Sequence, residues 1–374
     1  MNNRERAMAV LNYENYDKMP IVHFGYWGEL LQKWHREGHL TKEEADGYGD
    51  GNQTDKQIAG KLGFDFCWTC QGGGHGGLMP GFEYKVLERK PSGFIVHQNW
   101  NGLIEEIRPG INSIPATVGT LMTGREAWEE LYKPKLQLSE QRYGSPEQLA
   151  GLKDYLDNMT GQPAGIHAGS LYGSVRDMLG VEGISYLYAD DEDLYIEIID
   201  TIGNICYENI RAILESGVKP DFLHYWEDIC FKNGPLVNPA VFKEYVGPHY
   251  KKINDTARKY GVKIASLDCD GCIDKLVPIW LENGVNTMFP IEVGTWNASI
   301  KPWREAYGKE LRGVGGMNKN VLARDFKAVD EEIERLKPLV DMGGFIPCPD
   351  HRLPPNAEWD NTRYYCDQMR KIFG

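Results

Sequence analysis

The second half of the sequence alternates short β-rich apolar runs with amphipathic helical stretches. The strand-like runs are 163–168, 221–225, 262–267, 285–290, 311–315 and 344–348. The helical stretches are 174–179 with 191–215, 238–260, 273–282, a short helix around Trp303, 326–340 and 360–372. Such alternation is typical of repeated βα units around a parallel sheet.

The first half adds two strand-like runs, 20–24 and 64–68, which brings the total to the eight strands that close a barrel. The region 84–108 does not fit the repeat. Its alternating apolar residues flank an Asn-Trp-Asn-Gly turn at 99–102, a pattern typical of an antiparallel ribbon. We therefore predict an α/β fold, a single-domain (β/α)8 TIM barrel over 1–374, with an antiparallel β insertion (about 80–160) over one mouth.

Charge and composition restrict the possible partners. The 41 Lys and Arg residues are outnumbered by 54 Asp and Glu residues, so the net charge is −13. A field of this sign repels phosphate backbones and anionic lipid, which argues against nucleic acid as a partner. Residues 1–17 resemble no targeting segment, and no apolar run is long enough to span a bilayer. The eight cysteines are best interpreted as reduced thiols, and we expect a cytoplasmic protein.

Four titratable residues follow directly after three predicted strands. They are Asp268, Asp270, Glu292 and His351. Because barrel enzymes place their working residues at the carboxyl ends of the strands, we expect these side chains to meet. Several carboxylates around one imidazole need a cation, and this set suits Zn²⁺ with an open position, or Mn²⁺ or Mg²⁺. The alternative is that Asp268 or Asp270 caps a helix beginning near Cys272.

Other strand ends supply candidates for catalysis and substrate binding. Glu227, Asp228 and Lys319 could orient a substrate or supply a proton. The predicted substrate-binding residues are Tyr26, Trp27, Glu29, His75 and Trp100, several of which would form an apolar wall. The glycine-rich loop 71–77 lacks the Lys-Ser/Thr of a phosphate cradle and is interpreted as a flexible loop near a ligand.

Several motifs together resemble the uroporphyrinogen decarboxylase superfamily. They are Arg-Ala-Met-Ala-Val-Leu-Asn-Tyr at 6–13, Trp-Glu-Asp at 226–228, Gly-Gly-Met-Asn-Lys at 315–319 and Gly-Gly-Phe-Ile-Pro-Cys-Pro-Asp-His-Arg-Leu-Pro-Pro at 343–355. The resemblance spans nearly the whole chain and implies an (α/β)8 barrel. The superfamily contains tetrapyrrole decarboxylases and methyltransferases that work with corrinoid proteins. The decarboxylases carry an arginine-rich segment after the first strand, whereas residues 23–29 here contain no arginine.

The methyltransferase branch implies a zinc site written His-x-Cys, then Glu, then Cys. This sequence is similar in spacing, with Asp268, Asp270, Glu292 and His351 at those positions. Such ligands would make the metal a harder Lewis acid, suited to the oxygen of a methyl ether. The resemblance thus implies an O-demethylase-type methyltransferase that passes a methyl group from a small methoxylated donor to cob(I)alamin. No Asp-x-His-x-x-Gly stretch occurs, so cobalamin is expected on a separate corrinoid protein.

Two other functions remain open at the level of sequence. One is a metal-free decarboxylase acting on a smaller or tetrapyrrole-like carboxylate. The other is a non-catalytic binding protein of a corrinoid system.

Overall fold

The computed structural model describes residues 1–109 and 115–374. Short parallel strands form a ring in the order expected from the sequence. The eight barrel strands are β1 (Val22–His23), β2 (Phe66–Cys67), β8 (Gly165–Gly169), β9 (Phe222–Trp226), β12 (Ile264–Asp268), β13 (Thr287–Phe289), β14 (Arg312–Met317) and β15 (Phe345–Pro349). Each coincides with a strand expected from the sequence, so the predicted barrel is confirmed.

Two sets of short contacts close the ring between strands that share few backbone hydrogen bonds: one joins β2 to β8, and the other joins β15 to β1. β3 (Gly72–Gly73) continues the course of β2 and pairs in parallel with β8. β1 pairs with β2, and the chain after β15 reaches the chain after β1 through hydrogen bonds from Leu353 N to Gly25 O and from Trp27 N to Leu353 O. The last strand therefore returns to the first.

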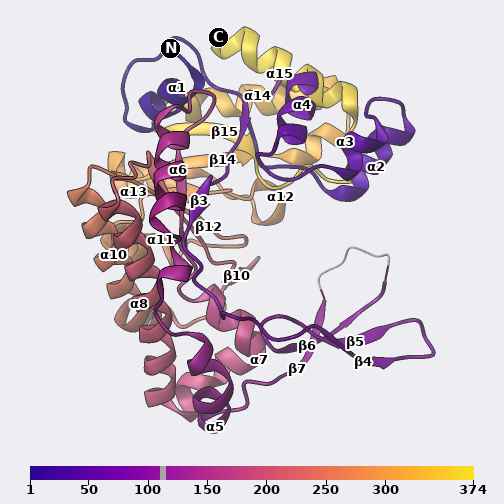
Figure 1. Cartoon of the computed structure of the whole chain (residues 1–374). Coiled ribbons are helices and arrows are strands. Elements are labelled where there is room, and N and C mark those ends of the chain that lie inside the picture. Colours follow the sequence, from indigo (N-terminus) through magenta and orange to yellow (C-terminus); the bar gives the residue numbers. More distant parts are fainter. Residues whose placement is uncertain (110–114) are drawn as a thin grey trace.

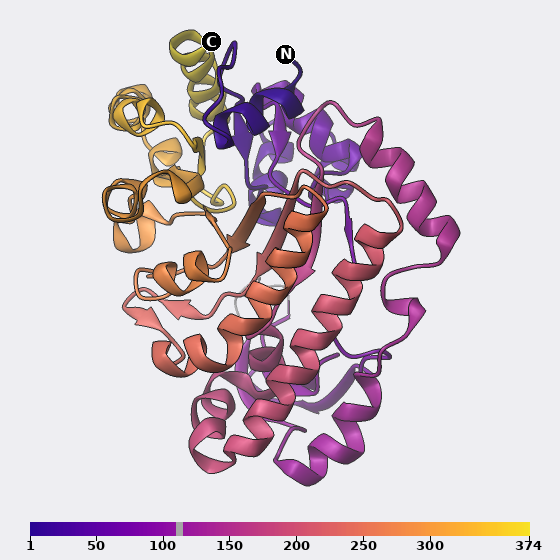
Figure 2. The ribbon, with the colours of Figure 1, turned by 90° about the vertical axis from the view of Figure 1, so that its left-hand side faces the viewer.

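Helices cover the outside of the strands (Figure 2). They are α1 (Asn3–Leu11), α2 (Gly28–Arg36), α3 (Lys42–Asp46), α4 (Gln53–Leu62), α5 (Arg125–Ala127), α6 (Pro146–Asp157), α7 (Gly173–Asp190), α8 (Glu192–Glu215), α9 (Pro239–Val241), α10 (Gly247–Lys259), α11 (Val277–Glu282), α12 (Val293–Trp296), α13 (Ile300–Tyr307), α14 (Phe326–Asp341) and α15 (Trp359–Phe373). In α8, buried residues such as Ile198, Ile202 and Ile205 recur at helical spacing and face the core. Asp191 caps this helix by accepting from Leu194 N.

The insertion forms an antiparallel sheet of four strands, β4 (Lys85–Arg89), β5 (Ile95–Gln98), β6 (Leu103–Ile107) and β7 (Ala116–Thr120). The predicted ribbon corresponds to β4 to β6, whereas β7 was not expected. Residues 110–114 of the predicted insertion lie outside the described residues. The Thr120 hydroxyl donates to Met178 O on α7, and because α7 follows the carboxyl end of β8, the sheet lies at that end of the barrel. It projects beside α7 in Figure 1.

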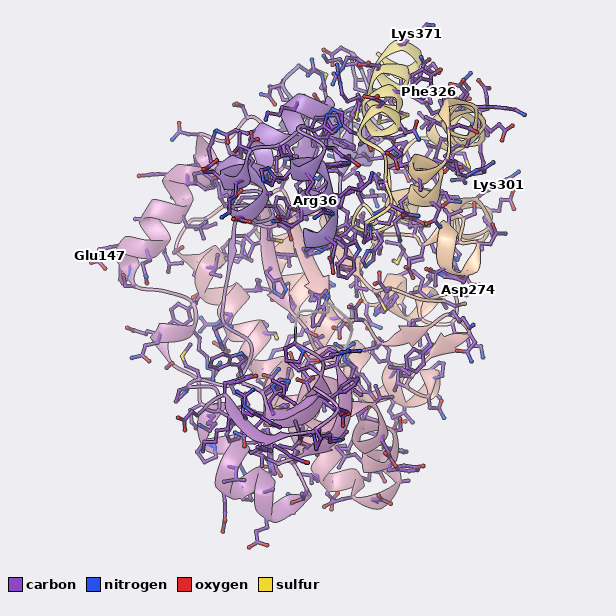
Figure 3. The ribbon with its side chains drawn as sticks, turned by 90° about the vertical axis from the view of Figure 1, so that its right-hand side faces the viewer. Arg36, Glu147, Asp274, Lys301, Phe326 and Lys371 are labelled. Carbon is purple, nitrogen blue, oxygen red and sulfur yellow. The ribbon has the colours of Figure 1, made fainter. Side chains whose placement is uncertain are left out.

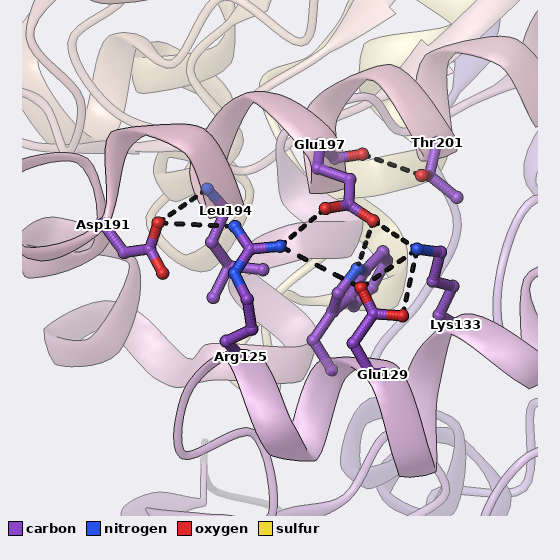
Figure 4. Close-up of polar contacts among 8 residues, drawn as sticks. Arg125, Glu129, Lys133, Asp191, Leu194, Glu197 and Thr201 are labelled. Carbon is purple, nitrogen blue, oxygen red and sulfur yellow. Dashed lines mark hydrogen bonds and ion pairs between the residues drawn. The ribbon is translucent and has the colours of Figure 1, made fainter.

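A network of ion pairs attaches the segment after this sheet to the barrel (Figure 4). Arg125 of α5 contacts both Asp191 and Glu197, with 2.7 Å between Arg125 Nη1 and Glu197 Oε2. Glu197 Oε1 also forms an ion pair with Lys133 Nζ at 2.7 Å and accepts a hydrogen bond from the indole N–H of Trp128 at 3.0 Å. Three donors on a short helical segment therefore converge on one carboxylate of α8.

Helix boundaries differ from expectation in several places. α7 continues to Asp190 across a kink at Gly180, where φ is +74°. The expected helix 238–260 consists of α9, a π-helical turn (Phe242–Val246) and α10. α11 begins at Val277 rather than at 273 and has no side-chain cap. A small hairpin, β10 (Cys230–Phe231) and β11 (Gly234–Pro235), was not expected.

Within residues 1–109 and 115–374, no helix is long and apolar enough to cross a membrane.

Figure 3 views the molecule from the side on which the four-stranded sheet projects, with Arg36 of α2 above that sheet.

Candidate active site

A cavity of about 400 Å³ lies at the carboxyl ends of the barrel strands. Its lining residues come from the ends of the strands or from the loops that follow them. They are Phe24, Trp27, Asp50, Cys67, Trp68, Thr69, Cys70, His167, His224, Trp226, Asp228, Asp268, Asp270, Phe289, His351 and Arg352. This is the position at which barrel enzymes bind their substrates.

Three carboxylates gather on one wall of the cavity. Asp228, Asp268 and Asp270 each offer an oxygen within 4.8 Å of the other two. Asp268 is the last residue of β12, and its backbone pairs with Trp226 at the end of β9. Asp270 N donates to Asp228 Oδ1 at 3.0 Å, which joins the two strand ends directly. The parallel register of β9 and β12 therefore builds the group.

The surroundings of these carboxylates disfavour three negative charges without a counter-ion. Burial, followed by the nearby Asp228 and Asp270, raises the pKa of Asp268 well above its ordinary value. Burial and Asp270 raise the pKa of Asp228 to about 6. Asp270 Oδ1 is buried and has no hydrogen-bond partner among the residues that the structure describes. An orphaned oxygen within a group of carboxylates fits a divalent cation, because oxygen ligands at short mutual distance are what such ions bind.

His351 lies beside this group. Its Nε2 is 3.2 Å from Asp270 Oδ2, and its ring stacks on Trp27 with 5.8 Å between the ring centroids. Phe24 packs against the same imidazole edge-on at 5.4 Å. The structure therefore brings together Asp268, Asp270 and His351 from the predicted metal set.

Glu292, the fourth predicted ligand, is engaged elsewhere. Its carboxylate accepts from Gly271 N at 2.6 Å and from the Thr295 hydroxyl at 2.8 Å. It therefore supports the loop that carries Asp270, and Asp228 completes the group of three within 4.8 Å. The capping alternative is wrong for Asp268 and Asp270, because α11 has no side-chain cap.

Two of the predicted catalytic residues lie away from the cavity. Glu227 is fully buried, and its carboxylate accepts from the backbone N–H groups of 171–173 at the start of α7 and from the Tyr250 hydroxyl. Burial raises the pKa of Glu227. Lys319 Nζ lies 3.8 Å from Asp350 Oδ1 and does not line the cavity. Asp228 alone of the three faces it.

Among the predicted substrate-binding residues, Trp27 lines the cavity and the other four do not. Tyr26 is buried and stacks on His23, and Glu29 is half-buried in the first turn of α2. His75 is exposed, and its carbonyl accepts from Arg142. Trp100 is 65% exposed in the turn of the four-stranded sheet.

Sequence reasoning missed most of the cavity's remaining lining. His167 and His224 are register partners on β8 and β9. The alternation of side chains along the strands could have indicated them, because alternate residues face the barrel interior. Arg352 and Asp50 are 302 positions apart and form an ion pair at the rim. No local pattern could have indicated that pair.

A second mixed group, His23, Asp55 and Cys67, is buried near β1, β2 and α4. His23 Nδ1 accepts from Gly25 N at 3.1 Å, so the proton of the neutral ring is on Nε2, 3.5 Å from Asp55 Oδ1. Burial lowers the pKa of His23 to about 3 and raises that of Asp55 to about 7. Since a protonated Nε2 cannot ligate a metal, we interpret this group as a buried polar contact between His23 and Asp55.

Comparison with known proteins agrees with the fold. The family model for uroporphyrinogen decarboxylase (URO-D) matches residues 175–372. A methyltransferase from Methanosarcina mazei superposes with a TM-score of 0.61 at 14% identity, covering 100% of both chains. A B12-independent methionine synthase from Shewanella sp. W3-18-1, in complex with selenomethionine, gives a TM-score of 0.49 at 13% identity, covering 95% of this chain and 98% of that one.

No curated protein matches the sequence. At 14% identity the likeness to the methyltransferase from Methanosarcina mazei concerns the fold alone. The family match covers more than half of the chain and includes the strand ends that carry Asp228, Asp268, Asp270 and His351. The chain belongs to the uroporphyrinogen decarboxylase family.

Proposed function

We propose that this protein is a metal-dependent methyltransferase that takes a methyl group from a small methoxylated donor and delivers it to cob(I)alamin on a separate corrinoid protein. The observation that carries the proposal is the group of three carboxylates, Asp228, Asp268 and Asp270, with the orphaned Asp270 Oδ1 at the cavity. The similar fold of a methyltransferase from Methanosarcina mazei supports the reaction class.

Asp228, Asp268 and Asp270 would hold a divalent ion such as Zn²⁺, Mn²⁺ or Mg²⁺, with His351 beside it. When bound, the metal supplies a Lewis acid that polarises the ether oxygen of the donor. Glu292 remains a candidate ligand only if the Asp270 loop rearranges, because its oxygens accept from Gly271 and Thr295.

The chain's own residues would handle the donor and its proton. In the transfer, the C–O bond breaks with its electron pair left on oxygen, the new bond to carbon uses the pair supplied by the corrinoid, and the oxygen takes up one proton. His351, 3.2 Å from Asp270, is positioned to hold that proton. Trp27 and Phe24, which pack against His351, would keep water from the donor.

A decarboxylase function is less favoured. A substrate carboxylate would need a cation, and among the described residues the only Lys or Arg side chain lining the cavity is Arg352, which is already paired with Asp50. A non-catalytic role in a corrinoid system does not explain why three carboxylates are grouped in the cavity.

Elemental analysis of protein purified without chelator tests the metal site. We expect near-stoichiometric metal in the wild type and in Asp193→Asn, an exposed carboxylate of α8 that serves as the matched control. Asp268→Asn and Asp270→Asn should lose most of the metal while their circular dichroism stays unchanged. Wild-type protein that holds no metal after Zn²⁺ or Mn²⁺ is offered would refute the proposal.

A further inference from the structure

The only Lys or Arg side chain lining the cavity, among the described residues, is not free to bind a substrate anion. Arg352 Nη1 donates to Asp50 Oδ1 at 2.8 Å, and Nη2 donates to Asp50 Oδ2. This fork-to-carboxylate geometry uses the donors that would otherwise bind an anion. The Tyr48 hydroxyl also donates to Asp50 and holds that carboxylate in place.

Two histidines supply uncharged polar atoms to the same cavity. His167 Nδ1 accepts from Gly169 N at 3.0 Å, so the neutral ring carries its proton on Nε2. His224 Nδ1 is 3.1 Å from Ser266 Oγ. Neither Nε2 has a hydrogen-bond partner among the described residues, and His224 is only 8% exposed. Burial lowers the pKa of both rings, to about 3 for His224, so they are uncharged near neutral pH.

The hydrogen-bonding pattern of the pair matches a hydroxyl group. His167 Nε2–H can only donate. His224 Nε2 can accept when its Nδ1–H donates to Ser266 Oγ. A hydroxyl accepts one hydrogen bond and donates another, and β8 and β9 place the two rings side by side in register. A carboxylate would instead share the cavity with three acidic side chains, whose combined negative charge a bound divalent ion does not fully cancel.

The remaining walls are aromatic. Phe24, Trp68 and Phe289 line the cavity, and Trp226 does so with its indole ring 5.2 Å from the guanidinium of Arg176. Aromatic side chains favour a flat apolar ring between them. The cavity volume of about 400 Å³ accommodates one substituted ring.

We infer that the methyl donor is an uncharged aromatic ether with a free hydroxyl, of the methoxyphenol class, and that His167 and His224 recognise that hydroxyl. The inference rests on the proposed function for the reaction itself. The selectivity it describes, for a phenol over a benzoate, belongs to binding alone and can be measured without methyl transfer.

Calorimetry on the metal-loaded protein with three matched ligands tests this selectivity. We expect 2-methoxyphenol to bind about 3- to 10-fold more tightly than methoxybenzene, the worth of one or two neutral hydrogen bonds. It should bind at least about 10-fold more tightly than 2-methoxybenzoate, because the only Lys or Arg side chain of the described lining, Arg352, is already paired with Asp50 and does not bind the ligand carboxylate. Equal or tighter binding of 2-methoxybenzoate, or no binding of any ring, would overturn the inference.

Variants locate the source of the selectivity. His167→Ala and His224→Ala should weaken the binding of 2-methoxyphenol about 3- to 10-fold and leave the affinity for methoxybenzene within about 2-fold of wild type. The control His39→Gln, outside the cavity, should change neither affinity. Asp50→Ala should free Arg352 and improve 2-methoxybenzoate binding about 10-fold or more. A hydroxyl preference that survives both histidine variants would contradict the assignment, even if Asp50→Ala behaves as expected.

Methyl transfer to cob(I)alamin, supplied both free and on purified candidate corrinoid proteins, is assayed separately and distinguishes failure of the inference from failure of the proposed function. Selective binding of 2-methoxyphenol without transfer would leave the inference standing and count against the proposed function. Transfer from 2-methoxybenzoate at the rate seen with 2-methoxyphenol would uphold the function and overturn the inference.

Discussion

Glu227 and Asp228 are neighbours in the sequence, but their carboxylates have different surroundings. Glu227 accepts from three consecutive backbone N–H groups at the start of α7 and from Tyr250, so its charge is used by the fold. Asp228, with φ of +48°, turns toward the cavity and joins the group of carboxylates. The Trp-Glu-Asp motif indicated both residues equally, because a strand end does not tell which side chain faces the cavity.

Glu227→Gln should destabilise the protein by roughly 2 to 4 kcal/mol, because an amide loses the charge-assisted bonds and turns an N–H₂ toward backbone donors. Urea unfolding followed by circular dichroism measures the change, with the exposed Glu182→Gln as control. An unfolding free energy equal to that of the control would show that the buried contacts of Glu227 do not support α7.

Gly315 in β14 has no room for a side chain. A Cβ there would lie 1.6 Å from Pro290 O, and φ is +131°. Gly315→Ala should therefore cost about 3 kcal/mol or more, from the collision and from the strained backbone together. Gly308→Ala, at φ of +62° with no atom within 4 Å, carries only the backbone strain and should cost about 1 to 2 kcal/mol. Equal losses in the two variants by thermal unfolding would contradict the predicted collision.

At the scale of elements, Glu197 joins α8 to the segment after the four-stranded sheet. Hydrogen bonds from Lys133, Trp128 and Arg125 lower its pKa from 4.5 to about 2. A lowered folded-state pKa gives stability that is present above the unfolded value and is lost as the pH falls toward 2. The side chain is 30% exposed, so we expect about 1 kcal/mol or less.

Thermal unfolding between pH 5.5 and pH 2.5 tests this contact. The wild type should lose more stability over that range than Glu197→Gln does, and added salt should reduce the difference. Parallel pH profiles for the two proteins would mean that the network in Figure 4 contributes nothing measurable.

The barrel strands were predictable because a strand buried on both faces is rich in apolar residues, as in β12, where every residue is buried and three of the five are apolar. The helix boundaries were not. The expected helix from 273 begins at Val277, because the Gly271 N–H donates to Glu292 and Cys272 N–H donates to Phe231 O across the loop. Contacts with distant residues, which have no local sequence pattern, fixed that start.

At the scale of the whole molecule, closure of the barrel explains which of the predicted site residues lie together and which do not. Asp268, Asp270 and His351 could be found because eight βα units imply a ring whose strand ends meet. The pairing of Asp50 with Arg352 depends on how the first and last strands meet, and Glu292 is diverted by the Asp270 loop. The chemistry of the cavity therefore depended on three-dimensional contacts that spacing alone does not specify.

The net charge of −13 bears on the encounter with a partner at the whole-molecule scale. A corrinoid protein that docks at the carboxyl end of the barrel would approach a molecule of negative net charge, so a basic docking face should associate faster at low ionic strength. Transfer rates measured with purified candidate corrinoid proteins between 20 and 300 mM salt check this. A rate that is independent of salt would argue against electrostatic steering.

Metal-dependent methyl transfer can be followed through the loss of cob(I)alamin absorbance when metal-loaded protein is mixed with 2-methoxyphenol. We expect a donor-dependent loss that stops when the metal is removed and returns when it is restored. The rate should fall about 100-fold or more in Asp268→Asn but not in Asp193→Asn. Equal rates in metal-free and metal-loaded protein, or in Asp268→Asn and wild type, would contradict a metal-dependent transfer at this cavity.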